Sequence, residues 1–244
     1  MEYGISGYRS EHERYVNKNV VQLDYVQTDL MGDGSQDRVY LLAVREGDNL
    51  ILDDISIVIE LEKSNERQYY TLPISRGMGG SLHVEDFNHD RKKDIGVYVQ
   101  TGGTGNQINY WIFFNQGDCF YLGFDSKSFE SKMKFTVTYQ PNYEVEVLHV
   151  PTNQSHKINL ENRADSYLEA IYLPTGELKA PLKGVVAPVH DSDPIESKIY
   201  NNGYDLILVQ RVLGRSHNDT LGYIQSYLTF DNQQYHVYKI LISQ

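Results

Sequence analysis

Apolar and polar residues alternate in short runs along this chain, and polar turns separate one run from the next. The first series of runs occupies residues 20–28, 39–44, 55–61 and 68–74. Short strands that recur about every 8–12 residues are typical of β-sandwiches and β-propellers. The chain also contains 20 tyrosines, and tyrosine favours strands. We therefore expect an all-β protein whose strands are joined by tight turns.

The series of runs repeats along the chain. After a polar lead-in over residues 1–19, it predicts a single β-repeat domain over residues 20–244, with units of roughly 20–75, 81–126, 133–174 and 184–244. The interval from Asp29 to Asp86 is 57 residues, and so is the interval from Asp37 to Asp94. A fixed interval of this kind indicates a repeat architecture. We expect a small β-propeller-like repeat fold of about four blades, with an incomplete propeller or stacked antiparallel sheets as the alternative.

An acidic loop occupies residues 86–94, directly ahead of an apolar run that begins at Ile95. Calcium binds about six to eight oxygen atoms, and a tight loop turns alternate side chains inward. An EF-hand loop would need a bidentate glutamate at position 12, where this chain has Val97. The pattern predicts a calcium site of another type, and a solvated acidic turn is the alternative. The oxygen-bearing side chains stand at positions 1, 3, 5 and 9 and belong to Asp86, Asn88, Asp90 and Asp94.

The first unit has a similar loop over residues 29–37. Met31 fills position 3 and supplies no oxygen ligand, so water or a neighbouring group would have to replace it. Gly34 at position 6 suits a backbone with positive φ. We therefore expect two Ca²⁺ sites, of which the Asp86 loop is the stronger. The carboxylates of the first loop stand at positions 1, 5 and 9 and belong to Asp29, Asp33 and Asp37.

The two loops, each ahead of a β run, resemble the calcium loops of FG-GAP or VCBS-type repeats. Such repeats occur in integrin-α propellers and in bacterial repeat proteins, some of them tied to spores. The resemblance covers most of the chain from Val20 onward. It implies that the side chains at positions 1, 3, 5 and 9 bind the ion together with the carbonyl at position 7. That carbonyl belongs to Ser35 in the first loop and to Lys92 in the second.

Composition and charge restrict the classes of partner. The formal net charge is −11, which argues against binding to nucleic acid or to anionic membrane surfaces. Cys119 is the single cysteine, so we expect neither an intrachain disulfide nor a thiolate zinc site. The chain lacks a run of about 18 apolar residues, so we expect no insertion into a membrane. No apolar segment follows Met1, and we expect no signal peptide within this chain.

These observations predict a calcium-binding, non-catalytic β-repeat module, a binding protein or a surface- or spore-associated one. Its ligand would be a protein or a glycan, and association of two copies is a further option. Calcium loops favour an extracellular, cell-surface or spore-associated location. We identify no catalytic residue and no organic cofactor, and we favour a protein that is not an enzyme.

The alternative function is a hydrolase or lyase that acts on a polysaccharide. Its basis is Glu144 and Glu146, which would lie on one face of a strand as a carboxylate pair. Two other motifs favour plain loops. The glycine-rich residues 101–105 precede a strand, whereas a phosphate-binding loop opens a helix. Residues 216–219 contain the residue types of a catalytic triad, but adjacent residues in a turn cannot form its relay.

Overall fold

The computed structural model describes residues 18–103, 105–200, 203–231 and 234–244. The polar lead-in predicted over residues 1–19 lies almost entirely outside them. The prediction of an all-β protein is confirmed, because the described elements are fifteen strands and two short helices. None of the described helices is long and apolar enough to span a membrane.

The first sheet is an antiparallel meander in which strands adjacent in sequence are also adjacent in the sheet, in the order β1-β2-β3-β4. Strand β2 alternates between buried and more exposed positions, as expected for a sheet with one face on a core, whereas the middle five residues of β3 are all buried. The interior face of β2 and β3 includes Leu41 and Ile57, both fully buried. The strands are β1 Val20–Thr28, β2 Asp37–Val44, β3 Asp53–Leu61 and β4 Glu66–Thr71.

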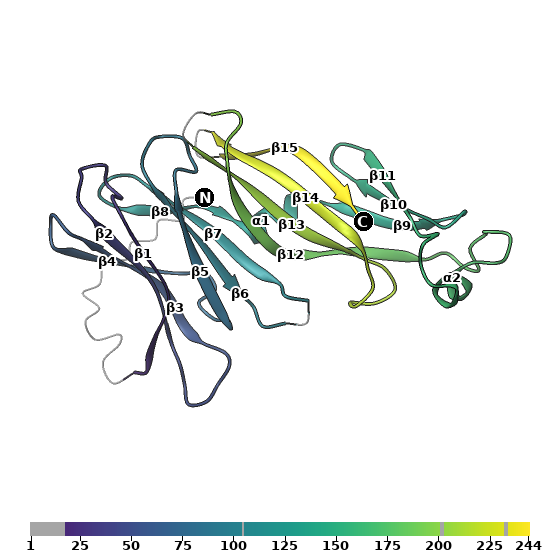
Figure 1. Ribbon diagram of the computed structural model, residues 1–244, viewed down its shortest axis with the longest axis horizontal. Coiled ribbons are helices and arrows are strands. Elements are labelled where there is room, and N and C mark those ends of the chain that lie inside the picture. Colours follow the sequence, from purple (N-terminus) through teal and green to yellow (C-terminus); the bar gives the residue numbers. More distant parts are fainter. Residues whose placement is uncertain (1–17, 104, 201–202, 232–233) are drawn as a thin grey trace.

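The second sheet has the same order, β5-β6-β7-β8. Each of these two sheets lies where the hydrophobic pattern places one unit, and each carries an acidic loop between its first two strands. Strand β7 is buried along its whole length, because the second sheet lies between the other two (Figure 1). The strands are β5 Gly79–Glu85, β6 Asp94–Gln100, β7 Ile108–Asn115 and β8 Phe120–Asp125.

The third sheet has seven strands in the order β11-β10-β9-β12-β13-β14-β15. It differs from the expectation of about four separate blades, because the third and fourth units share one sheet. After β11 the chain forms helix α2, Asp165–Ile171, instead of a fourth strand. At the other edge of this unit, β9 pairs with β12 at Thr138↔Lys183 and Val137↔Gly184. The remaining elements are α1 Ser126–Lys132, β9 Phe135–Gln140, β10 Glu144–His149, β11 Gln154–Asn159, β12 Lys183–Glu196, β13 Tyr204–Leu213, β14 Thr220–Asp231 and β15 Gln234–Ser243.

Three apolar cores hold the sheets together, and the sheets follow one another along the long axis of the molecule (Figure 1). One core lies between the first and second sheets and contains Trp111. Another joins the second and third sheets, where Phe230 of β14 packs against Phe114 and Phe124. The last core lies within the third sheet, around Tyr139 and Ile224. The acidic loops lie at one end of the first two sheets and are positioned by these packed strands.

Candidate metal centre

The two acidic loops have the same backbone conformation. Positive φ angles occur at positions 4 and 6 of both, with values of 72° and 84° at Gly32 and Gly34 and of 64° and 71° at His89 and Arg91. Glycine adopts this region freely, whereas a residue with a side chain loses about 1 kcal/mol or more there. The second loop therefore depends on contacts that hold its backbone in this conformation.

The carboxylate at position 1 organises each loop. Asp29 accepts hydrogen bonds from the N–H groups of Asp33 and Gly34, at 3.1 and 2.9 Å. Asp86 accepts the corresponding pair from Asp90 and Arg91, also at 3.1 and 2.9 Å. Positions 5 and 6 thus donate to position 1 in both loops. This arrangement turns the backbone around the first carboxylate.

The carboxylate at position 5 makes the same hydrogen bond in both loops, because it accepts the N–H of position 7. Asp33 accepts from Ser35 at 3.0 Å, and Asp90 accepts from Lys92 at 2.8 Å. The Ser35 hydroxyl also donates to Asp33. These bonds hold the pKa of Asp33 well below its ordinary value, at about 2, with the Ser35 hydroxyl as the largest cause.

The carboxylate at position 9 ties each loop to the next part of its sheet. Asp37 is 1% exposed and accepts the N–H groups of Leu30 and Glu62, both at 3.1 Å. Asp94 is completely buried and accepts from Phe87 and from Asn115, both at 2.9 Å. The donor at position 2 and the donor at the end of the third strand are thus equivalent in the two loops. A carboxyl group is held in the interior at both sites.

Burial disfavours the charged form of two carboxyl groups in the second loop. Burial raises the pKa of Asp94 from its ordinary 3.8 to about 7, although three backbone N–H groups lower it. Burial also raises the pKa of Asp86, and repulsion from Asp90 adds to this. The nearby Lys93 pairs with Glu85 at 3.3 Å. A cation bound in the loop would offset this desolvation.

The ion-free chain should lose stability as the pH rises from about 4 to about 7. The folded state then retains an Asp94 proton that the unfolded chain has already released, so folding becomes less favourable up to the pKa of the folded state. Urea unfolding in the presence of a chelator, measured between pH 4.5 and 7.5, checks this. Asp94→Asn should flatten the dependence, and Asp118→Asn, at an exposed position of the β7–β8 turn, should keep it. An equal slope in both variants would contradict the assignment.

The predicted ligands of the two loops lie in different surroundings. No three His, Cys, Asp or Glu side chains among the described residues lie close enough together to hold a metal ion by themselves. The three aspartates at positions 1, 5 and 9 of each loop are therefore not gathered around one point in this structure. Met31 packs against the core between the first two sheets and offers no oxygen. A polar hollow of about 370 Å³ opens beside the second loop and is lined by Asn88, Asp90, Lys92, Asn115, Gln116 and Tyr121.

Asn115 connects the two loops. Its side-chain Nδ2 donates to the Leu30 carbonyl of the first loop at 2.9 Å and to the Lys93 carbonyl of the second at 3.2 Å. Its Oδ1 accepts the N–H of Gly117 at 2.7 Å. Asn115 was not among the predicted ligands. The signal available in the sequence was an amide at the end of a mostly apolar strand.

Asn115→Leu should destabilise the protein by about 1–3 kcal/mol, because it leaves the buried Leu30 carbonyl and the partly buried Lys93 carbonyl without this donor. Urea denaturation measures this. Asn49→Leu, at an exposed turn position, is the matched control and should change the free energy of unfolding by less than about 0.5 kcal/mol. Equal effects of the two substitutions would show that Asn115 does not link the loops.

The second loop also contacts the third sheet. The His89 ring stacks on Tyr200 with a centroid distance of 4.1 Å, and its Nε2 lies 3.8 Å from the buried Asp205 carboxylate. The N–H of Tyr204 donates to the Asp86 carbonyl at 2.8 Å. Burial lowers the pKa of His89. These contacts explain how His89 is held at a positive φ, and they place the loop at the junction of two sheets.

Two other candidate groups have structural partners. Glu144 pairs with Lys157 of the neighbouring strand at 2.7 Å. Asp219 accepts the N–H of Arg215 and the hydroxyl of Tyr167, each at 2.8 Å, and so closes the β13–β14 turn against α2. The tertiary structure thus assigns residues 216–219 to a hydrogen-bonded turn.

The fold and the loops define a class of protein: an all-β chain of three sheets, with a pair of equivalent acidic loops at one end of the first two. The chain belongs to the YybI family. It is 30% identical over 207 residues to the uncharacterized protein YybI of Bacillus subtilis (strain 168), an alignment that covers 85% of this chain and 79% of that protein. The model of the YybI C-terminal domain matches residues 133–243, which correspond to the third sheet. No solved structure matches the chain significantly.

Proposed function

We propose that this chain is a calcium-binding, non-catalytic β-repeat module whose ions stabilise the loops at the ends of its first two sheets. The observation that carries the proposal is the equivalence of the two loops. They share aspartate at positions 1, 5 and 9 but differ at every other position, and yet they have the same positive φ angles and the same hydrogen bonds. A plain acidic turn has no need for this agreement.

The donor set fits a hard cation. The second loop would hold Ca²⁺ through Asp86, Asn88, Asp90, Asp94 and the Lys92 carbonyl. The first loop would use Asp29, Asp33, Asp37 and the Ser35 carbonyl. It lacks an oxygen at position 3 and would be the weaker site. Water would complete the about six to eight ligands that calcium takes, and the polar hollow beside Asn88 and Asp90 gives it access to the second loop. The resemblance to FG-GAP or VCBS-type repeats supports the same ligands.

Calcium would act here on stability. At a free concentration 100-fold above the dissociation constant, one site contributes about 2.7 kcal/mol. The contribution is large beside the about 5–15 kcal/mol of a whole domain. It would reach beyond the loops, because Asn115 joins them to each other and His89 joins the second to the third sheet. In this proposal the module presents its sheets to a protein or glycan ligand in a compartment where calcium is abundant.

Isothermal titration calorimetry with calcium chloride tests the proposal directly. The expected result is two binding events of unequal affinity, accompanied by a rise in melting temperature that a chelator reverses. Magnesium should bind less well, because it demands a near-octahedral site and retains its waters. A melting temperature that is identical with millimolar calcium and with chelator would refute the proposal. The alternative, a polysaccharide hydrolase or lyase, has less support, because the Glu144 carboxylate on which it rests is paired with Lys157 at 2.7 Å.

A further inference from the structure

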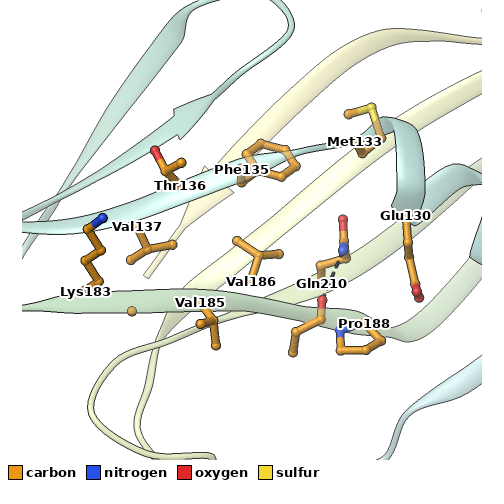
Figure 2. A pocket seen from close by; sticks show the side chains of 12 residues that line it. Glu130, Met133, Phe135, Thr136, Val137, Lys183, Val185, Val186, Pro188 and Gln210 are labelled. Carbon is orange, nitrogen blue, oxygen red and sulfur yellow. Dashed lines mark hydrogen bonds between the residues drawn. The ribbon is translucent and has the colours of Figure 1, made fainter.

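A cavity of about 380 Å³ lies in the third sheet, where two of its strands separate. Strands β9 and β12 pair only at Thr138↔Lys183 and Val137↔Gly184. Beyond Gly184 strand β12 turns away, and its register with β13 is irregular between Val186 and Asp191. Figure 2 shows the resulting opening, with Phe135 and Met133 on one side and Val186 and Gln210 facing them.

The cavity has apolar walls and one buried polar group. Gln210 is 4% exposed, and its Nε2 donates to the Ala187 carbonyl at 3.0 Å. That bond determines the orientation of the amide, because in the flipped orientation Oε1 would face the Ala187 carbonyl and be repelled by it. Oε1 is therefore directed away from Ala187 and has no hydrogen-bond partner among the described residues. A buried acceptor of this kind is suited to an N–H or O–H group supplied by a ligand.

Charged residues lie at the two ends of the cavity. Glu130 is already engaged, because it accepts the N–H of Val189 at 2.8 Å and pairs with Lys127 at 3.3 Å. Lys183 is exposed at the opposite end and is visible beside Thr136 in Figure 2. The ammonium group of Lys183 is thus the charged group available to a ligand, and it favours an anion.

We propose that this cavity binds a small anionic amphiphile. Its apolar body would lie against Phe135, Val137 and Val186, an N–H or O–H group would donate to Gln210 Oε1, and its acidic group would reach Lys183. The volume and the mixture of apolar walls with a few convergent polar groups are those of small-molecule sites. The cavity is built from the third sheet and from α1, apart from the acidic loops, so the proposal does not depend on calcium.

The dye 6-anilinonaphthalene-2-sulfonate is a suitable probe, because its apolar naphthalene body carries one N–H group and one sulfonate at opposite ends. Titration into the full chain, with chelator present, should give a saturable increase in fluorescence with one dye per chain. Gln210→Met retains the side-chain length, removes the acceptor and should weaken binding about tenfold, the effect of one hydrogen bond. Lys183→Gln should weaken binding about three- to tenfold and should reduce its dependence on salt. Circular dichroism verifies that each variant is folded.

Two matched controls separate this site from general surface adsorption. Lys198→Gln removes an exposed lysine from the β12–β13 connection, and Leu241→Ser removes an apolar side chain that is 38% exposed on β15. Both should bind the dye as the unchanged chain does. The proposal is overturned if fluorescence does not saturate, if Gln210→Met and Lys183→Gln bind normally, or if Leu241→Ser abolishes binding.

Discussion

Asp90→Ala is expected to remove most of the rise in melting temperature that calcium gives the unchanged chain. Asp90 lies at position 5 of the stronger loop and borders the polar hollow. Among the described residues its carboxylate bonds only to the Lys92 N–H, within the loop, so its removal takes away a ligand while the sheet keeps its packing. Saturation of that site should be worth about 2.7 kcal/mol, or about 5–10 °C for a chain of this size. Differential scanning fluorimetry with calcium and with chelator measures the difference.

Asp118→Ala is the control for this experiment. It removes the same charge from an exposed position of the β7–β8 turn and should leave the calcium response intact. Asp33→Ala, the equivalent change in the first loop, should reduce the response less, because that loop has Met31 at position 3. A calcium response in Asp90→Ala as large as that of the unchanged chain would contradict the assignment of Asp90 as a calcium ligand.

Phe230→Ala is expected to cause the largest loss of stability, about 3–5 kcal/mol. Its side chain is completely buried and extends from β14 of the third sheet into the aromatic residues of the second. Ring centroids lie 5.6 Å away at Phe114 and at Phe124, and 6.4 Å away at Phe87. Truncation leaves a cavity at the junction of the two sheets. The midpoint of urea unfolding and its slope measure the loss.

Two further variants make this result interpretable. Phe230→Leu retains much of the buried volume and should cost less than Phe230→Ala. Tyr223 lies on the same strand and is 37% exposed. Tyr223→Ala removes its ring and should change stability by about 0.5 kcal/mol or less. If Phe230→Ala were no more destabilising than Tyr223→Ala, the second and third sheets would not depend on each other for their stability.

Local patterns account for most of the elements and for the candidate loops. Strand periodicity depends on neighbours in sequence, so the runs that begin near Val20, Ile55 and Ile95 are strands in the structure. The aspartates at positions 1, 5 and 9 also act locally, because most of their hydrogen bonds stay within nine residues. Helix α1 was not predicted. Its seven residues are too few for a clear periodicity, although the Asp125 side chain caps it by accepting the N–H of Lys127.

The partners of each element depended on contacts between distant parts of the chain. The seven-stranded sheet exists because the outer edge of β9 pairs with β12, the first strand of the last four. Beyond that short pairing β9 and β12 separate, and the cavity around Gln210 lies where they do. No local motif in the sequence marks this cavity. The contacts of Asn115 with Leu30 and of His89 with Tyr200 likewise join parts of the chain that are far apart in sequence.

The amino-acid sequence by itself therefore determined the all-β class, the positions of most strands and the two acidic loops, since alternation and ligand spacing are properties of neighbouring residues. The tertiary structure alone decided the number of sheets, the residues that couple the loops and the location of a second candidate site. The reason is that strand edges and buried polar groups are satisfied by whichever partner the packed chain brings to them, and that partner is separated from them by many residues.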